Sequence, residues 1–239
     1  MTLSTASEKR LLADTAGKPM AIIPAREGSK RLKNKNKALI NGKPLVLYAI
    51  EAAKESGVFD AIVVSSDDEE ILEIAYENKV LPHKRAMGLA GDRVQVRHVC
   101  QYLLPVYGNP ECFCVLYPTN PFRTPEDLNN AYNLFLEKDA NYVMSVVTAS
   151  PPPQLALKKL RMGWLAPWIG VDEMKQSQKL ETLYRHDGSF IFAKSKIFLI
   201  EFDYKFYGSK VIPYFIEHPS VDIDTQDDLR YARYLMNER

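Results

Sequence analysis

The sequence predicts a single α/β domain built on a buried sheet of parallel strands. The first observation is a set of short β-branched or apolar runs at 20–23, 60–66 and 112–117, which are typical of strands covered on both faces. The second is the alternation of such runs with segments of helical spacing or helix-start chemistry. The third is the length of 239 residues, which suits one core of this class and does not require two domains.

The composition excludes several classes of function. Hydrophobic residues at 46% and charged residues at 26% are ordinary for a globular protein, and a formal net charge of +1 gives no general field for nucleic acid or membrane. Three cysteines lack zinc spacing and are expected to be reduced core residues in a cytoplasmic protein. No window approaches 18 consecutive apolar residues. Residues 1–19 have no apolar signal core, so we expect an N-terminal tail with room for a short helix at 8–14.

The first half of the chain alternates strands and helices. The run 20–23 is a strand that ends in a Gly/Ser loop, and 45–56 has apolar residues at helical spacing and ends at Gly57. The strand at 60–66 leads into four acidic residues, 67–70, which suit the N-terminus of a helix at 71–78 and need no catalytic explanation. A short strand at 79–81 and a helix at 94–104, stopped near Pro105, complete this half.

The second half continues the alternation with one interruption. The strand at 112–117 precedes a helix capped by Thr124, with Pro125 at its first position, and 141–148 is the next strand. Three prolines at 151–153 then break the pattern, and the stretch 150–185 carries Trp164 and Trp168 among polar residues. These tryptophans need burial, which favours pairing with a second subunit; the alternative is a lid over the protein's own site. A short helix at 194–200, a strand at 210–216 and a helix at 227–237 close the domain of residues 20–239.

The loop at 21–37 is a candidate anion site. A buried strand delivers it to the carboxyl edge of the sheet, Gly28 lets backbone N–H groups approach a phosphate, and Arg26, Lys30 and Lys35 supply charge-assisted hydrogen bonds. Glu27 opposes phosphate binding unless it points outward or pairs with Arg31 or Lys33, and of these we expect the pairing. The alternative interpretation is a solvated basic loop.

A second candidate cluster lies near the C-terminus at Asp222 and Asp224. In an extended Asp-x-Asp the two carboxylates point to one face, which makes a hard-oxygen site for Mg²⁺ with room for phosphate oxygens. Thr225 then caps the closing helix. A lone Asp-x-Asp is also common in surface turns and helix caps, so the metal site remains a hypothesis at this point.

The order of residues in the first loop narrows these interpretations. The run IPAREGSK at 23–30, followed after four residues by Lys35 and Asn36, resembles the signature of the cytidylyltransferases that activate nonulosonic acids such as sialic, legionaminic and pseudaminic acid. The resemblance implies a three-layer Rossmann-like nucleotide-diphospho-sugar transferase fold with a protruding dimerisation extension at 150–185. It also implies that the nucleotide is held by Ala25, Arg26, Gly28, Ser29, Lys30, Lys35 and Asn36.

Further segments carry the same resemblance. The segment from Arg85 to Asp92 resembles one that lies over the nucleotide, although the basic run 93–97 departs from the family where the base is read. The run LYPTNPFRT at 116–124, with a Gln in the extension and a Tyr-x-x-Asn-Gly-like turn at 184–188, resembles the sugar site. The implied sugar-binding residues are Tyr117, Thr119, Arg123, Gln178 and Asp187, and for Arg123 a loop-bracing role is equally open. Tyr117, Ser177 and Asp187 depart from the sialic acid pattern.

Together these features imply a Mg²⁺-dependent homodimeric enzyme that acts on CTP and a nine-carbon 2-keto-3-deoxy sugar acid. Its catalytic residues are expected to be Arg26, Lys30, Asp222 and Asp224, with Asp222 and Asp224 as metal ligands. Two alternatives within the enzyme class are the relative that acts on the eight-carbon sugar 3-deoxy-manno-octulosonate and a different nucleotidyl donor. A third is a nucleotide-binding protein that kept the fold and lost turnover.

Overall fold

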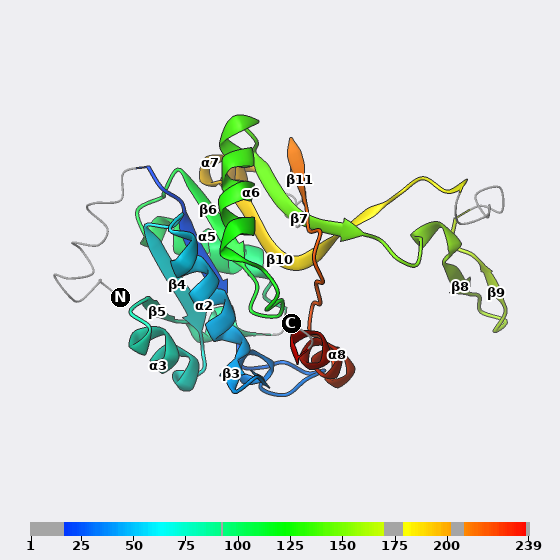
Figure 1. Ribbon diagram of the computed structural model, residues 1–239, viewed down its shortest axis with the longest axis horizontal. Helices are drawn as coiled ribbons and strands as arrows, with labels where there is room; N and C mark the ends of the chain where they lie inside the picture. Colours follow the sequence, from blue (N-terminus) through cyan, green and yellow to red (C-terminus); the bar gives the residue numbers. More distant parts are fainter. Residues whose placement is uncertain (1–16, 92, 170–178, 202–207, 238–239) are drawn as a thin grey trace.

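The computed structural model describes residues 17–91, 93–169, 179–201 and 208–237, and its centre is a seven-stranded sheet (Figure 1). The strand order is β11-β7-β10-β6-β1-β4-β5. All neighbouring strands are parallel except that β10 runs antiparallel to both β6 and β7. The strands are β1 (Met20–Pro24), β4 (Ala61–Ser66), β5 (Leu81–Lys84), β6 (Cys112–Leu116), β7 (Tyr142–Thr148), β10 (Tyr184–Lys194) and β11 (Val211–Phe215).

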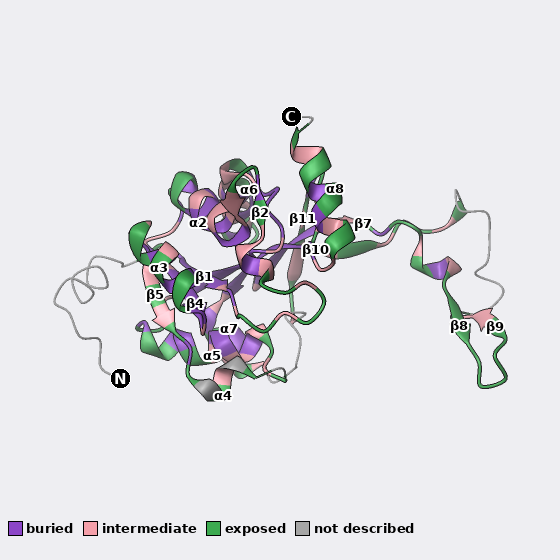
Figure 2. Ribbon diagram, turned by 90° about the horizontal axis from the view of Figure 1, so that it is seen from below, coloured by how far each residue is buried: buried purple, intermediate pink, exposed green. Residues whose placement is uncertain are grey.

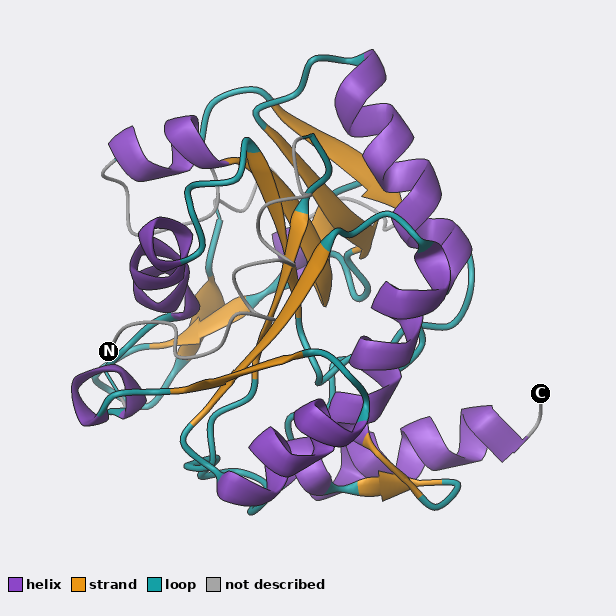
Figure 3. Cartoon of the chain, turned by 90° about the vertical axis from the view of Figure 1, so that its left-hand side faces the viewer, coloured by secondary structure: helices purple, strands orange, loops and turns teal. Residues whose placement is uncertain are grey.

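Helices cover both faces of the sheet, which gives the three layers that the family resemblance implies (Figure 3). Side chains of β1 alternate between the faces: Ala21 and Ile23 belong to one hydrophobic cluster, Met20 and Ile22 to the other. The first cluster is covered by α2 (Leu45–Ser56), α3 (Glu69–Glu77) and α6 (Pro125–Glu137), and the second by α5 (Val96–Val106) and α7 (Ser195–Ile200). Because both faces are covered, the central strands are apolar throughout.

A third, smaller cluster packs the last helix against the segment around Ile40 beside the sheet. Leu229 and Ala232 of α8 (Gln226–Asn237) pack with Ile40, Leu45 and Ile223. Ile40 belongs to the short strand β2 (Leu39–Ile40), which pairs with β3 (Lys43–Pro44). This pair of strands follows the 3₁₀ turn η1 (Lys35–Lys37). The first loop and the segment before α8 are therefore neighbours in space (Figure 1).

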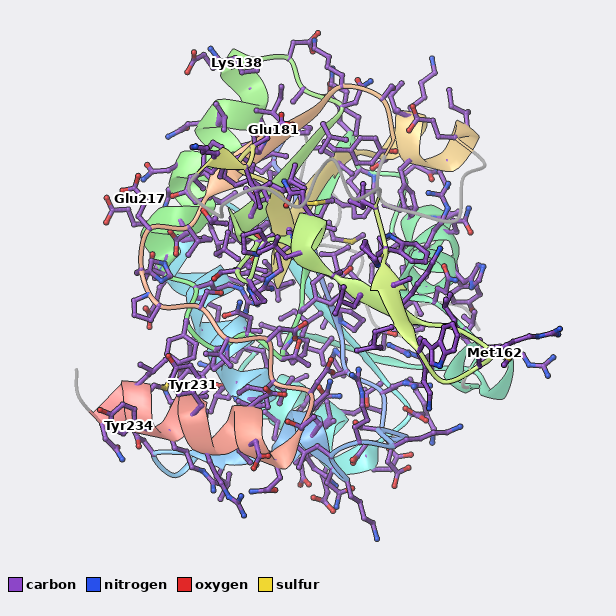
Figure 4. All side chains as sticks on the ribbon, turned by 90° about the vertical axis from the view of Figure 1, so that its right-hand side faces the viewer. Lys138, Met162, Glu181, Glu217, Tyr231 and Tyr234 are labelled. Carbon is purple, nitrogen blue, oxygen red and sulfur yellow. The ribbon has the colours of Figure 1, made fainter. Side chains whose placement is uncertain are left out.

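The extension predicted at 150–185 stands off the body of the molecule. After the 3₁₀ turn η2 (Pro153–Leu155), the strands β8 (Leu157–Lys159) and β9 (Leu165–Pro167) form a separate antiparallel pair. Figure 2 shows this hairpin mostly as exposed surface, and Figure 4 labels Met162 near its tip. The side chains of Trp164 and Trp168 are 69% and 66% exposed, so this chain alone does not bury them.

Three details differ from the sequence expectations or lie beyond them. Lys79 adopts a left-handed conformation in the turn after α3, so the third strand is β5 at Leu81–Lys84 and not 79–81. Helix α5 runs through Pro105 to Val106, because a proline in the last turn removes a single helix hydrogen bond. The helix expected at 8–14 lies outside the described residues. In the described ranges, no helix is long and apolar enough to cross a membrane.

Candidate active site

The loop after β1 is tethered to its neighbours by backbone groups. Ala25 donates its N–H to the Ser65 carbonyl at 2.9 Å, and Glu27 donates its N–H to Oδ1 of Asp67 at 2.9 Å. From the other side, the buried Asn36 donates through Nδ2 to the Arg26 carbonyl at 2.8 Å. These bonds fix the course of the loop at the carboxyl edge of the sheet, where ligands of open α/β sheets bind.

The remaining loop residues lie toward solvent. Gly28 and Lys30 are exposed, Ser29 is half-buried, and an added Cβ at Gly28 would meet nothing. Glu27 is exposed as well, and the Arg31 that could have paired with it contacts Asp224 instead. Glu27 therefore takes the outward position, and the loop keeps its cationic character.

The carboxylates of the second cluster meet this loop. Asp224 accepts from Lys35 Nζ through Oδ1 at 2.8 Å and pairs through Oδ2 with Arg31 Nη2 at 2.7 Å. The structure thus joins Lys35 and Asp224, which lie 189 residues apart in the sequence. Ile223 donates its N–H to the Thr119 carbonyl at 2.8 Å, which fastens the Asp-x-Asp segment to the loop after β6.

Asp222 lies directly over Gly188. Glycine is required at position 188 for two reasons. An added Cβ would come within 2.5 Å of Asp222 Cγ, and the backbone φ of +77° is one that other residues rarely adopt. The side chain of Asp222 reaches solvent, yet the protein atoms around it remove part of its hydration and raise its pKa. The charge of Asp224 raises this pKa further, while a hydrogen bond from Thr119 and the charge of Lys35 oppose the rise. A cation near Asp222 would therefore stabilise the ionised form of its carboxylate.

Asp228 holds the backbone of this segment, a role that motif comparison did not identify. Its Oδ2 accepts from the N–H groups of Asp224 at 3.1 Å and Thr225 at 2.8 Å, and from the Thr225 hydroxyl at 2.8 Å. Partial burial opposes ionisation, but these hydrogen bonds outweigh it and the pKa of Asp228 is lowered. Thr225 caps α8 as expected, since Asp228 returns its N–H to the Thr225 hydroxyl at 3.2 Å. The Thr-x-x-Asp spacing was the available signal.

Arg123 is buried behind the expected sugar site. It donates through Nε to the Ser189 hydroxyl at 3.1 Å and through Nη2 to the carbonyls of Ser189 and Tyr117. Burial is the main influence on its pKa, which falls to about 10. These contacts brace the end of β6 against the middle of β10, and whether Arg123 also contacts a sugar stays a prediction.

Asp187 is the centre of a buried hydrogen-bond network. Its side chain is 2% exposed. Oδ1 accepts from the hydroxyl of Ser145 and the N–H of Ser189, and Oδ2 accepts from Nδ2 of Asn120 and the hydroxyl of Ser220. These bonds join β7, the turn of β10, the loop after β6 and the segment before Asp222. Whether Asp187 also contacts a sugar stays a prediction, as it does for Tyr117 and Thr119.

Arg85 is buried beneath the first loop. It donates through Nε to the Ser65 hydroxyl at 3.2 Å and through Nη2 to the Ser65 carbonyl at 3.0 Å, the same carbonyl that Ala25 uses. Burial is the largest influence on its pKa, which is lowered. Asp92 and Gln178 lie outside the described residues.

Arg97 shows that part of the basic run 93–97 faces away from this edge. It is buried, donates through Nη2 to the Phe198 carbonyl at 2.9 Å, and lies 4.6 Å from the centroid of the Phe198 ring. Phe198 belongs to α7, so Arg97 packs against that helix. The departure from the family pattern at this position therefore affects the packing of α7.

Comparison with known proteins agrees with this geometry. The cytidylyltransferase family model matches residues 20–233. A pseudaminic acid cytidylyltransferase from Campylobacter jejuni is 33% identical over 223 residues, which are 91% of this chain and 96% of that protein. A CMP-N,N'-diacetyllegionaminic acid synthase from Legionella pneumophila is 32% identical over 224 residues, covering 91% and 95%. An N-acylneuraminate cytidylyltransferase from Streptococcus agalactiae is 31% identical over 214 residues, covering 88% of this chain and 51% of that protein.

Solved structures support the fold at lower identity. A CMP:2-keto-3-deoxy-manno-octonic acid synthetase complexed with CTP aligns with a TM-score of 0.70 and 14% identity, over 93% of this chain and 99% of that one. A 4-diphosphocytidyl-2C-methyl-D-erythritol synthase from Anaerococcus prevotii aligns with a TM-score of 0.63 and 16% identity, over 92% and 99%. Both are nucleotidyltransferases of Rossmann-like architecture. By its sequence match over nearly the whole sheet domain, the chain belongs to the cytidylyltransferase family and is a nucleotidyltransferase enzyme.

Proposed function

We propose that the protein transfers the cytidylyl group of CTP to a nine-carbon 2-keto-3-deoxy sugar acid, giving a CMP-sugar and pyrophosphate. The observation that carries this proposal is the contact between the basic loop and the carboxylate pair, with Lys35 Nζ 2.8 Å from Asp224 Oδ1. A triphosphate needs positive charge along its length. Lysines and arginines supply part of this charge, and a divalent ion held by carboxylates supplies the rest. The contact places both kinds of group at one edge of the sheet.

The choice of sugar rests on the relatives. The proteins at 31–33% identity are named for pseudaminic, legionaminic and N-acylneuraminic acid, all nonulosonic acids. The octulosonate synthetase structure is 14% identical, which supports the fold without extending its substrate to this chain. A nonulosonic acid is therefore the better candidate.

The donor set fits a magnesium ion. Asp222 and Asp224 offer hard oxygens. Burial is the main cause of the raised pKa of Asp222 and the charge of Asp224 adds to it, so a divalent ion bound here would favour the ionised carboxylates. No group of three or more metal-ligating side chains occurs among the described residues, and Mg²⁺ commonly uses one or two carboxylates together with substrate phosphates. When bound, the ion would polarise the α-phosphate and neutralise charge that develops on it.

The protein's own residues would position the reactants. In the proposed reaction the C2 hydroxyl oxygen of the sugar bonds to the α-phosphorus, the bond from that phosphorus to the β-phosphate oxygen breaks, and the hydroxyl proton passes to solvent. Arg26 and Lys30 would hold the β- and γ-phosphates and stabilise the departing pyrophosphate. Asn36 contributes indirectly, since its bond to the Arg26 carbonyl fixes the backbone from which the arginine projects. Arg85 supports the same loop through Ser65.

An assay of pyrophosphate release tests this proposal. The purified chain is supplied with Mg²⁺, each of the four nucleoside triphosphates and a panel of sugar acids that includes nonulosonic acids and 3-deoxy-manno-octulosonate. We expect release with CTP and a nonulosonic acid only. Release with octulosonate alone, or with a triphosphate other than CTP, would overturn the assignment of substrate. If no pair of substrates gives pyrophosphate release, the proposal that this chain catalyses the reaction is wrong.

The homodimer belongs to the same proposal. The hairpin of β8 and β9 carries four strongly exposed apolar side chains, at Met162, Trp164, Leu165 and Trp168. A second copy of this chain would bury them, and the projecting position suits a segment that reaches a neighbouring subunit. Sedimentation of the full chain should give a dimer, and Trp164→Ser with Leu165→Ser should give a monomer; a monomeric parent would refute the proposal.

We also assign the protein to the cytoplasm. Cys100, Cys112 and Cys114 are free and buried, and burial raises the pKa of Cys112 to about 11. Thiols held in this form suit a reducing compartment.

A further inference from the structure

Two cations occupy both oxygens of the carboxylate proposed to bind metal. Arg31 lies 2.7 Å from Oδ2 of Asp224 and Lys35 lies 2.8 Å from Oδ1. We call this arrangement the Asp224 clamp. While the clamp is closed, each oxygen that would bind a divalent ion already has a positive partner. A metal that binds Asp224 must therefore compete with these side chains.

The two cations differ in how easily they can leave. The side chain of Lys35 is 14% exposed, whereas that of Arg31 is 67% exposed and projects from the loop that carries Gly28 and Lys30. An exposed ion pair is weak because water and salt screen it, so Arg31 can be drawn away at small cost. Arg31 also acts on the charge of Asp228, whose pKa it helps to lower. It is thus the mobile counter-ion of the carboxylates on this side of the site.

We infer that Arg31 is a positioning residue that occupies Asp224 in the empty enzyme and is transferred to the phosphates of the nucleotide. This inference rests on the proposed function, because it takes Asp224 as a metal ligand and the loop as a phosphate site. A triphosphate next to Lys30 offers Arg31 several negative oxygens in place of one carboxylate. Asp224 then exposes Oδ2 only when the nucleotide is present. Nucleotide and metal consequently strengthen each other's binding, and the coupling is reciprocal.

Metal binding without nucleotide tests the first half of the inference. The full chain is titrated with Mn²⁺ as the probe, and free Mn²⁺ is followed by electron paramagnetic resonance. Arg31→Ala and Arg31→Gln should bind Mn²⁺ about 1.5- to 5-fold more tightly than the parent, as expected for loss of a competing exposed ion pair. The matched control is Lys33→Ala, which removes the same charge two residues away, and it should leave the affinity unchanged. Arg31→Lys keeps the charge and should stay near the parent.

Each outcome has one reading. If Asp224→Asn binds Mn²⁺ as the parent does, the metal assignment falls and the inference falls with it. If Asp224→Asn loses binding while Arg31→Ala matches Lys33→Ala, the inference alone is wrong. Far-ultraviolet circular dichroism of each variant checks that the fold is intact.

Nucleotide binding without metal tests the second half. CTP is titrated calorimetrically in the presence of a chelator. Arg31→Ala should bind CTP more weakly than the parent and than Lys33→Ala, opposite in direction to its effect on Mn²⁺. An arginine that only braced the loop would not move the two affinities in opposite directions. If Arg31→Ala binds CTP as tightly as the parent, the transfer of Arg31 to the phosphates is refuted.

Discussion

Asp187 shows how a single buried residue can join several segments of a candidate site. It bonds four groups from three other parts of the chain, and its partners Asn120, Ser145 and Ser220 lie between 33 and 67 residues away. The family resemblance predicts that Asp187 binds the sugar, and that stays a prediction; the hydrogen-bond partners of Asp187 could not be predicted, because a motif records position and does not reveal them. Its burial and its four bonds indicate a residue that holds the segment before Asp222 in place.

The first prediction at this scale concerns Asp224. Asp224→Asn keeps the size of the side chain and removes its charge, so the pairs with Lys35 and Arg31 weaken and the proposed metal ion would lose a charged ligand. We expect kcat to fall by about 10²-fold or more, the usual cost of losing a group that stabilises transition-state charge. Steady-state kinetics with CTP measures this. A variant that turns over normally would show that Asp224 is not a metal ligand.

The second prediction concerns Gly188. Gly188→Ala places a Cβ 2.5 Å from Asp222 Cγ and forces a left-handed backbone on alanine. The matched control is Gly108→Ala in the sheet domain, where φ is +81° and an added Cβ meets nothing. We expect the control to lose about 1–2 kcal/mol of unfolding free energy from the backbone alone. Gly188→Ala should lose about 1–3 kcal/mol more through overpacking.

Urea unfolding of both variants measures this difference, and kcat falls only in Gly188→Ala, because Asp222 is displaced. Equal losses of stability in the two variants would contradict the close approach of Asp222 to Gly188.

At the scale of elements, the N-terminus of α6 is tied to the chain that leads to the carboxylates. Asp127 completes the capping box with Thr124 and accepts from His218 Nε2 at 2.8 Å. His218 Nδ1 lies 3.0 Å from the Pro219 carbonyl, so both ring nitrogens face acceptors. Tyr214 of β11 donates to Asp127 Oδ1 at 3.3 Å. Helix α6, strand β11 and the segment approaching Asp222 are therefore joined at one carboxylate.

This junction predicts a dependence of stability on pH. Burial opposes ionisation of Asp127, but hydrogen bonds from His218 and Thr124 outweigh it, and the pKa in the folded state is lowered. A lowered pKa stabilises the fold fully above the unfolded value, about 3.9, and this contribution is lost as the pH falls through the folded-state value. At about pH 6, the free energy of unfolding of Asp127→Asn should be about 1–2 kcal/mol lower than that of the parent.

The difference from the parent should shrink as the pH is lowered from about 3.9 toward about 3, because the unfolded state then takes up a proton that the folded Asp127 resists, and the parent loses stability. Urea unfolding at the two pH values measures it, and Glu126→Gln on the same helix turn, with its exposed carboxylate, serves as the control. A pH-independent difference would mean that Asp127 acts through its shape and not through its charge.

The helices and strands were largely predictable from the sequence, whereas the long-range contacts that hold the site residues in place were not. Buried strands such as β6 are continuous apolar runs, and caps such as Thr124 follow local spacing, so both are written in neighbouring residues. The contacts that complete the site link residues far apart, as in Lys35 to Asp224 or Asn120 to Ser220. Local patterns do not encode such pairings. The candidate phosphate-binding and metal-binding residues were predicted because a family motif marks them, and their roles stay predictions. The contacts of Asp228 and Arg31 were not predicted, because no motif marks these residues.

At the scale of the whole molecule, the chain consists of a closed sheet domain and an open hairpin. The domain buries its apolar residues in three clusters, whereas the hairpin leaves its own apolar residues exposed. The two parts therefore differ in what stabilises them. The domain depends on its own core, and the hairpin gains by association with another surface.

This division predicts that deleting the hairpin will spare the fold. Replacing residues 157–167 by a short Gly/Ser linker removes β8 and β9 and leaves the seven-stranded sheet and its helices intact. We expect urea unfolding of the deleted chain to give a denaturant slope close to that of the parent at low protein concentration, since little buried surface is lost. A deletion that fails to fold would show that the hairpin is part of the core.

The hairpin also has a spectroscopic consequence. The chain contains two tryptophans, Trp164 and Trp168; both lie on this segment, and neither belongs to any of the three hydrophobic clusters. Intrinsic tryptophan emission therefore reports on the hairpin alone and is nearly blind to the sheet, whose unfolding must be followed through tyrosine or far-ultraviolet signals. The protein carries a native optical probe of whether this hairpin is covered, and a red shift of that emission upon dilution would mark the separation of the two chains of the proposed dimer.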